Sequence, residues 1–396
     1  MDLNSLLSEA VEAGASDVHV KVGAVPKVRR EGRLEQFSEA RLSEADLLSV
    51  LEQVCASSPA RRDAFLDCGE LDIAYMGDGC RFRVNGYRQR GTAAFVFRRI
   101  PNEPMTLAEL ALPPGVKRLV HEHHGLILVT GPTGSGKSTT LAAMIDEINR
   151  TRQQHIVTIE DPIEVLHRDR TSSVSQREIG LDTKSFGEAL RRALRQDPDV
   201  ILIGEMRDAE TAETALHAAE SGHLVLSTMH TVNAAETIGR LVEFFPADKH
   251  AQIRSIVAGV LRGVVSQRLL PKIDGGVVAA VEVMIVNSRI ADLIRELKPE
   301  GITDAIADGS YSEMQTFEQA LVRLVVDGVV DREVAANAAS VRHDFLVTLD
   351  RATKKGAAEL SRTIPEPVEP DSAPRASEPT PPAVAASAGL RVARRD

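Results

Sequence analysis

The chain has 396 residues, of which 43% are hydrophobic and 26% are charged, and its formal net charge is −10. This length allows two or three domains with hydrophobic cores, and the acidic balance disfavours a general binder of nucleic acid or anionic lipid. No apolar run approaches the roughly 18 to 20 residues of a membrane-spanning helix. The run VVAAVEVMIV (277–286) is short and carries Glu282, and the first residues do not predict a signal peptide. Three cysteines without C-x-x-C spacing predict reduced thiols.

The first hundred residues predict an α+β domain. Residues 2–13 have the apolar spacing of an amphipathic helix, and further helices are expected near 43–54 and 59–67. Strands are expected at the alternating or β-rich segments DVHVKV, PKVRRE, ELDIAYM, RFRVNGYR and TAAFVFR. The proline-marked segment IPNEPMTLAELALPPG follows. We therefore place an N-terminal domain at 1–99 and an interdomain linker at 100–115.

From residue 126 onward, β-rich runs alternate with helical runs, which predicts an α/β domain with a mostly parallel sheet. The expected strands are LILVT, IVTIE, VILIG and LVLST. Helices are expected near 137–149, 184–196, 208–221 and 234–244, and later near 248–262, 288–296, 313–327 and 331–339. The domain is placed at 116–350. The proline-rich residues 351–396 lack periodicity and are expected to form a disordered tail.

The segment LILVTGPTGSGKSTT contains the phosphate-loop motif G-x-x-x-x-G-K-S between a β-rich run and a helical run. Backbone N–H groups in such a loop and the start of the following helix bind nucleotide phosphates. We expect Lys137 to reach the β- and γ-phosphates of ATP, Ser138 to ligate Mg²⁺ and Thr139 to contact the α-phosphate. The expected binding residues are Gly131, Pro132, Thr133, Gly134, Ser135, Gly136, Lys137, Ser138 and Thr139.

Acidic residues follow two of the predicted strands. VILIGEMRD (200–208) has Gly204 where such strands often end in a magnesium-side aspartate, and Glu205 comes next. HIVTIEDPIEV (155–165) ends in three carboxylates, Glu160, Asp161 and Glu164. Alone these acids also fit a solvated turn, but beside a phosphate loop they predict a set that holds Mg²⁺ mostly through water, with Glu164 also a catalytic candidate. Glu205 is then left to polarise the attacking water.

Histidines occur in two further segments. GHLVLSTMHT (222–231) places His223 and His230 at opposite ends of a predicted strand, so a shared metal is not expected. We expect His230 to sense the γ-phosphate, whereas His223 fits a sensor and a core residue equally well. The cluster HEHHG (121–125) fits a surface turn better than a metal site, because no cysteine or acidic pattern at ligand spacing accompanies it.

The motifs GPTGSGKST, TIEDPIE, GEMRD and GHLVLSTMHT together resemble those of the type II and type IV secretion ATPases, most closely the pilus retraction ATPases of the PilT type. GASDVHV, RFRVN, VFRRIP, SQREIGLDT and ALRRALRQDPD extend the resemblance to roughly residues 1–345. It implies a PAS-like N-terminal domain, a RecA-like ATPase domain and arginines that complete a nucleotide site at a domain or subunit boundary. By motif match these are Arg83 and Arg98, with Arg81 as a further candidate. Such arginines offset charge on the transferring phosphoryl group.

The resemblance also implies a function and partners. The chain would be a hexameric ATPase motor that powers type IV pilus retraction and twitching motility. It would lie in the cytoplasm, peripheral to the inner face of the cytoplasmic membrane, without direct membrane insertion and without a nucleic-acid partner. Its expected partners are further copies of itself, an inner-membrane pilus platform protein and a paralogous ATPase.

Two features bear on whether such an ATPase would drive retraction or extension of a pilus. Pilus extension and type II secretion members of the family commonly carry a four-cysteine zinc module, and this chain has no cysteine beyond Cys80, which favours retraction. RIADLIRE (289–296) replaces a family segment resembling AIRNLIRE that is tied to retraction, so an extension or type II secretion ATPase remains open. A nucleotide-gated scaffold with negligible hydrolysis is a third possibility, which a phosphate-release assay separates from a motor. A nucleic-acid translocase would be supported by ATPase stimulation by DNA.

Overall fold

The computed structural model describes residues 2–30, 32–77, 79–101 and 103–363. Its contacts divide the chain after Leu349, and the unit before that point contains two β-sheets, each with its own buried apolar cluster. The first sheet belongs to the residues expected to form the N-terminal domain. The second belongs to the expected ATPase region.

The N-terminal sheet is antiparallel, with the strand order β3-β2-β1-β6-β5-β4. Its strands are β1 (Asp17–Lys21), β2 (Lys27–Arg30), β3 (Arg33–Gln36), β4 (Glu70–Met76), β5 (Arg81–Gln89) and β6 (Thr92–Ile100), and the helices of this region are α1 (Leu3–Glu12), α2 (Glu44–Val54) and α3 (Pro59–Cys68). Alternate residues of β5, such as Phe82 and Val84, are buried because successive side chains of a strand point to opposite faces. The five strands expected from the sequence are present, and the short, mostly exposed β3 is additional.

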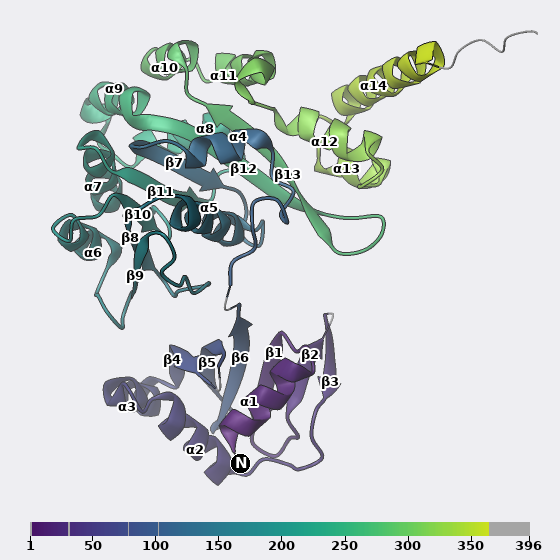
Figure 1. The fold of residues 1–396 in the computed structure, drawn as a ribbon. Helices are drawn as coiled ribbons and strands as arrows, with labels where there is room; N and C mark the ends of the chain where they lie inside the picture. Colours follow the sequence, from purple (N-terminus) through teal and green to yellow (C-terminus); the bar gives the residue numbers. More distant parts are fainter. Residues whose placement is uncertain (1, 31, 78, 102, 364–396) are drawn as a thin grey trace, which may run out of the picture. The chain divides into compact units, whose positions relative to one another are not determined.

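The second sheet has the strand order β13-β12-β7-β11-β10-β8-β9, in which only the pair β12–β13 is antiparallel. Its strands are β7 (Gly125–Thr130), β8 (His155–Glu160), β9 (Ser173–Glu178), β10 (Val200–Ile203), β11 (Leu224–Met229), β12 (Leu261–Pro271) and β13 (Val277–Ile285). Helices follow most of the strands and pack against the sheet (Figure 1). This arrangement confirms the expected α/β class with a mostly parallel sheet.

The helices of this region connect the strands and then continue the chain toward its C-terminal end. They are α4 (Pro114–Val120), α5 (Lys137–Thr151), α6 (Phe186–Ala193), α7 (Ala209–Glu220), α8 (Ala234–Glu243), the 3₁₀ helix η1 (Ala247–Lys249), α9 (His250–Val260), α10 (Ser288–Arg295), α11 (Glu300–Ala307), the 3₁₀ helix η2 (Asp308–Ser312), α12 (Phe317–Val326), α13 (Arg332–Ala338) and α14 (Arg342–Thr363). None of the helices within the described ranges is both long enough and apolar enough to cross a bilayer.

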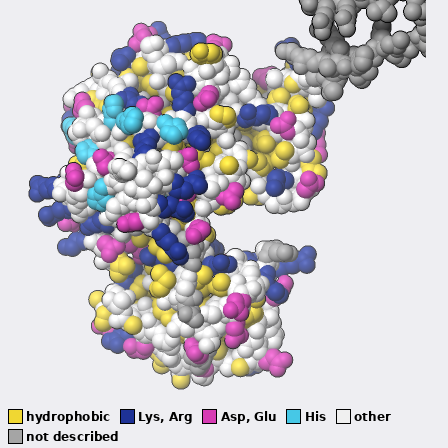
Figure 2. Space-filling model, viewed as in Figure 1, with side chains coloured by type: hydrophobic (Ala, Val, Ile, Leu, Met, Phe, Trp, Pro, Cys, Tyr) yellow, Lys and Arg dark blue, Asp and Glu magenta, His cyan; other side chains and the backbone are white. Residues whose placement is uncertain are grey.

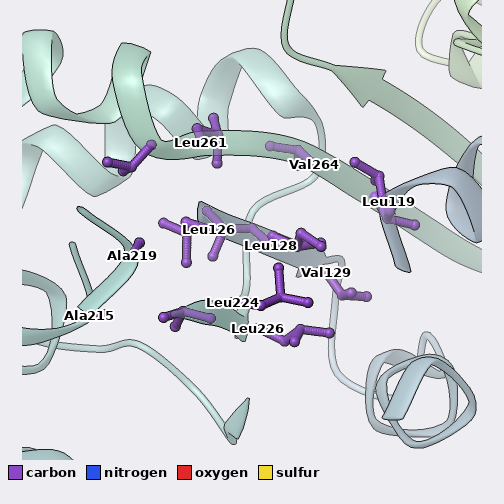
Figure 3. Packing of buried hydrophobic residues seen from close by; sticks show 14 of the residues in the cluster. Leu119, Leu126, Leu128, Val129, Ala215, Ala219, Leu224, Leu226, Leu261 and Val264 are labelled. Atoms are coloured by element: carbon purple, nitrogen blue, oxygen red, sulfur yellow. The ribbon is translucent and has the colours of Figure 1, made fainter. Parts of the chain in front are cut away.

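The centre of the second sheet is apolar on both faces. All six residues of β7 are buried, and its side chains lie between those of β11 and β12 (Figure 3). The labelled residues of these strands are Leu126, Leu128 and Val129 of β7, Leu224 and Leu226 of β11, and Leu261 and Val264 of β12. A parallel strand that is covered on both sides has no polar face, so its sequence reads as a continuous apolar run.

The structure differs from the sequence expectations in several places, and β9 and α11 are elements that were not expected. The helix expected at 248–262 ends at Val260, and the chain continues directly into β12, whose partner β13 contains the VVAAVEV segment. The expected linker contains the start of α4. Helix α14 continues to Thr363, beyond the expected start of the tail at residue 351, while residues 364–396 of that tail lie outside the described residues.

Charged side chains are mixed on the face shown in Figure 2, where Lys and Arg lie among Asp and Glu. Neighbouring charges of opposite sign therefore partly offset each other on this face.

Candidate active site

The phosphate loop connects the end of β7 at Thr130 with the start of α5 at Lys137. Three of its glycines have positive φ angles: +145° at Gly131, +79° at Gly134 and +87° at Gly136. Side-chain-bearing residues rarely adopt such angles, and a Cβ on Gly131 would also lie 2.3 Å from the backbone oxygen of Gln267. The glycines of the motif are therefore required by the path of the backbone and by the close approach of β12.

Lys137 is directed into the loop. Its ammonium group donates hydrogen bonds to the carbonyl oxygens of Gly131 at 2.9 Å and Pro132 at 3.1 Å. Burial lowers the pKa of Lys137, and the nearby carboxylates of Glu205 and Glu164 act in the opposite direction. The lysine therefore lies where a phosphate chain held by the loop would meet its charge.

A cleft of about 700 Å³ brings together most of the site residues expected from the sequence. Its lining includes Arg83, Arg98, Thr133, Gly134, Gly136, Lys137, Ser138, Thr139, Glu160, Asp161, Glu164, Glu205 and His230. Of the other expected loop residues, Gly131 and Pro132 accept the Lys137 hydrogen bonds and Ser135 is buried, with 3% of its surface exposed.

Glu160 lies at the end of β8 and is held by three donors. The Thr158 hydroxyl donates to Glu160 Oε1 at 2.6 Å, Gln176 Nε2 donates to the same oxygen at 3.1 Å, and the N–H of Glu164 donates to Oε2 at 3.4 Å. Burial raises the pKa of Glu160, while the bonds from Thr158, Gln176 and Glu164 favour its ionised form. These contacts give the acidic segment after β8 a defined position at the carboxyl end of the sheet.

Gly204 allows this acidic segment to lie close to the end of β10, which is the neighbour of β8. Its N–H donates to the carbonyl of Ile159 at 2.8 Å. A Cβ at position 204 would lie 3.3 Å from the Ile159 oxygen and 3.4 Å from Glu160 Cα, closer than most Cβ atoms approach their neighbours. The glycine in GEMRD is therefore consistent with carboxylates that are supplied by the neighbouring strand.

Glu205 is mostly buried, and two basic side chains besides Lys137 lie against it. Its carboxylate lies 3.3 Å from Nε2 of His230 and also pairs with the guanidinium of Arg207, which lines the same cleft. The Thr228 hydroxyl donates to the Gly204 carbonyl at 2.7 Å and links the ends of β10 and β11. Arg207 was not expected at the site, although its position two residues after Glu205 in GEMRD was a usable signal.

The whole sequence also resembles a known protein family. The family described as "Type II/IV secretion system protein" matches residues 1–368. The chain belongs to the type II/IV secretion system protein family. The type IV pilus retraction ATPase PilT of Pseudomonas aeruginosa is 44% identical over 346 residues, which cover 87% of this chain and 100% of PilT. The type IV pilus ATPase PilU of the same organism is 39% identical, over 91% of this chain and 94% of PilU.

A solved structure extends this family relationship to the fold. The crystal structure of the pilus retraction motor PilT with bound ADP matches with a TM-score of 0.80 and 45% identity, over 86% of this chain and 97% of that chain. The resemblance to PilT-type ATPases that the motifs indicated is therefore confirmed, together with the α/β fold that it implied.

Two residues considered from the family motifs lie elsewhere. The guanidinium of Arg81 donates to Glu178 Oε2 at 2.7 Å, with Arg81 partly buried and Glu178 buried, so Arg81 links β5 to β9 and does not line the cleft. His223 lies at the start of β11, where its Nδ1 is 3.0 Å from the carbonyl oxygen of Ala218. It is therefore at the opposite end of the strand from His230, as the spacing predicted.

His167 and Gln267 belong to the surroundings of the site but were not expected from the sequence. Burial lowers the pKa of His167, which lines the cleft, to about 4. Gln267 in β12 donates from Nε2 to the carbonyl of Ser135 in the phosphate loop at 2.7 Å. An isolated histidine in a loop and a glutamine within an apolar run carry no motif, so only their tertiary neighbours reveal them.

The donor set fits Mg²⁺. The hydroxyl of Ser138 and the carboxylates of Glu160, Asp161 and Glu164 are hard oxygen ligands that line one cleft. In the part of the chain that the structure describes, no group of three or more His, Cys, Asp or Glu side chains is arranged to hold a metal ion by itself, and this includes the HEHHG segment. The cleft residues therefore fit an ion that is also bound by phosphate oxygens and water.

Proposed function

We propose that this chain hydrolyses ATP and uses the energy to power retraction of a type IV pilus. The observation that carries the proposal is the cleft in which the phosphate loop, the acidic segment after β8, Glu205 and His230 meet. The relatives named PilT ATPase and pilus retraction motor support the direction of work.

In the proposed mechanism, the phosphate loop and Lys137 bind the phosphate chain and offset its charge. Ser138 and the carboxylates Glu160, Asp161 and Glu164 would hold Mg²⁺ and its water ligands. When bound, Mg²⁺ supplies positive charge at the phosphate oxygens.

Glu205 accepts a hydrogen bond from the attacking water and directs it toward the γ-phosphate. Nε2 of His230 lies 3.3 Å from Oε2 of Glu205. His230 can therefore contact the γ-phosphate and Glu205 together and act as the sensor of the γ-phosphate. Arg83 and Arg98 supply guanidinium groups that offset charge as the phosphoryl group is transferred.

We further propose that the working form is a homohexameric ring in the cytoplasm, held at the inner face of the cytoplasmic membrane by an inner-membrane pilus platform protein. The presence of both PilT and PilU among the relatives in one organism supports a paralogous ATPase as an additional partner. Neither nucleic acid nor direct membrane insertion has a role in this proposal.

The catalytic part is tested with Glu205→Gln in the purified protein. The amide keeps the size of the side chain but is a poor acceptor for the water's proton, so we expect ATP hydrolysis to fall at least about 100-fold while ATP binding is retained. Phosphate release and calorimetry measure the two quantities. Glu213→Gln at an exposed position of α7 is the matched control. Undiminished hydrolysis in Glu205→Gln would overturn the assignment of Glu205.

The direction of work is tested in cells. A strain that lacks its own retraction ATPase should shorten its pili when it expresses this chain, but not when it expresses Glu205→Gln. An extension ATPase is favoured by one observation: Ala291 and Asp292 in α10 replace the arginine and asparagine of the family segment. Pilus assembly without shortening would support that second function and contradict retraction.

A further inference from the structure

Strand β12 contacts the phosphate loop through a side chain that the proposed mechanism does not use. Gln267 is 1% exposed, and its Nε2 donates to the carbonyl oxygen of Ser135 at 2.7 Å. The preceding residue, Ser266, accepts a 3.0 Å hydrogen bond from the hydroxyl of Thr130, where β7 ends and the loop begins. Two successive residues of β12 are therefore bonded to the start and the middle of the loop.

Gln267 lies so close to the phosphate loop that two loop glycines have little room for a Cβ. A Cβ on Gly131 would lie 2.3 Å from the backbone oxygen of Gln267, and a Cβ on Gly136 would lie 3.1 Å from its Nε2. The backbone of Gln267 thus packs against one end of the loop and its side chain against the other. A strand in this position limits the conformations that the loop can adopt.

The orientation of the Gln267 amide follows from its partner. A carbonyl oxygen can only accept, so the NH₂ end of the side chain must face Ser135. Its Oε1 is buried and has no hydrogen-bond partner among the residues that the structure describes. Within those residues, the bond to Ser135 is what holds the amide, and the amide is not shared with another polar network.

Holding the Ser135 carbonyl also sets the direction of the next N–H. In a trans peptide the C=O and N–H bonds point to opposite sides, so an oxygen that faces β12 directs the N–H of Gly136 away from β12. Gly136 lines the cleft beside Lys137 and Ser138. We propose that Gln267 is a positioning residue for the phosphate loop, which holds the Ser135–Gly136 peptide so that its N–H points at the nucleotide phosphates. The inference rests on the proposed binding of ATP.

Gln267→Met is the main test, because methionine has a similar length and volume but no donor. Loss of one buried hydrogen bond should weaken ADP binding about tenfold, measured by calorimetry. The control is Arg268→Met in the neighbouring position of β12. Arg268 also donates to a distant carbonyl, that of Ala338 at 2.7 Å, but it points to the other face of the sheet. We expect Arg268→Met to bind ADP as the wild type does.

A second readout separates positioning from a general loss of folding. Gln267→Met should weaken the binding of pyrophosphate by the same factor as the binding of ADP. Adenosine, which lacks phosphates, should bind the variant and the wild type with equal affinity. Gln267→Glu, with a carboxylate that cannot donate to Ser135, should weaken ADP binding at least as much as methionine does. Thermal unfolding without nucleotide shows how far each variant is destabilised.

The outcomes are distinct. If the wild type binds ADP and Gln267→Met binds it equally well, the role of Gln267 is wrong and the proposed function stands. The role is also wrong if Arg268→Met loses the same affinity, or if adenosine and ADP are weakened alike. If the wild type itself binds no ADP, the proposed function fails.

Discussion

Gly204 and Glu205 are adjacent at the end of β10 but affect different parts of the cleft. The lack of a Cβ at position 204 lets the end of β10 lie against Ile159 and Glu160, so the acids after β8 reach the cleft. Glu205 is directed toward His230 instead. The site therefore separates the carboxylates proposed for Mg²⁺ from the one proposed for water.

Gly204→Asp should lower ATP turnover at least about tenfold, although it restores an acid at the usual place. The new Cβ would have to displace Ile159 or Glu160, and a second carboxylate beside Glu160 would repel it. Steady-state hydrolysis across a range of Mg²⁺ concentrations measures the effect. Gly239→Asp is the control, because a Cβ there has nothing within 4 Å. Equal or greater activity in Gly204→Asp would contradict this account of the glycine.

His167 should make folding stability depend on pH. Its pKa is lowered from 6.5 to about 4 in the folded chain, so the unfolded chain binds more protons between these values. Stability is then lost as the pH falls through this window, by about 2 kcal/mol between pH 7 and pH 5. Arg170 is the charged group that acts in the same direction as burial.

Urea unfolding at the two pH values measures this contribution as the difference between the wild type and His167→Leu, which lacks the titrating group. His343→Leu, at an exposed position, serves as the control. The same loss of stability between pH 7 and pH 5 in the wild type and in His167→Leu would show that His167 does not contribute.

At the scale of elements, the helix after the phosphate loop also holds the segment that follows the acidic residues. Asn149 in α5 is fully buried; its Nδ2 donates to the carbonyl of Arg168 at 2.8 Å and its Oδ1 accepts from the N–H of Arg170 at 3.2 Å. One turn earlier, Asp146 pairs with Arg170 and Arg150. Helix α5 therefore connects the phosphate loop at its start with the acidic segment near its end.

Asn149→Ala should lower the free energy of unfolding by about 1 to 2 kcal/mol, because the partly buried carbonyl of Arg168 and N–H of Arg170 each lose a hydrogen bond to the Asn149 side chain. Urea unfolding measures this loss. Turnover should also need a higher Mg²⁺ concentration, since the acidic segment loses an anchor. Glu213→Ala, an exposed helical change, is the control. A stable variant with unchanged Mg²⁺ dependence would show that the segment is held by other contacts.

At the scale of the whole molecule, Arg83 and Arg98, which are proposed to act at the phosphate loop, come from the N-terminal sheet. Arg83 and Arg98 line the cleft of the same chain, and Arg98 is also bonded to Asp17 through Nε at 2.8 Å. The family resemblance allows a domain boundary or a subunit boundary for these arginines. Rings that contain two different variants of the chain distinguish an arginine that acts in its own subunit from one that acts in the neighbouring subunit.

Arg98→Ala and Lys137→Ala should each be nearly inactive alone. If Arg98 acts across a subunit boundary, rings co-expressed from both variants in equal amounts should regain about a quarter of the wild-type rate, since random mixing joins an intact loop to an intact arginine at about that fraction of sites. Phosphate release measures the rate, and Lys137→Ala mixed with Lys137→Ala is the control. No recovery would place Arg98 in the site of its own subunit.

The motifs alone were enough to predict the phosphate loop, the acidic segment, Glu205 and His230 as one site in a sheet of alternating strands and helices. These residues line one cleft because parallel strands end at one edge of the sheet, and the motif is visible in the sequence because a loop that binds phosphate needs glycines and a lysine at local spacing. The same periodicity could not identify β12, because a strand covered on both faces is apolar throughout and resembles a buried helix.

Only the tertiary structure showed which distant residues meet. Gln267 and Ser135 are 132 positions apart, and Arg81 and Glu178 are 97 apart. Neither pair has a sequence pattern, because a buried hydrogen bond or ion pair depends on where the chain places its partner. The chemistry of the site thus follows from local spacing, while the groups that hold it in shape follow from long-range packing.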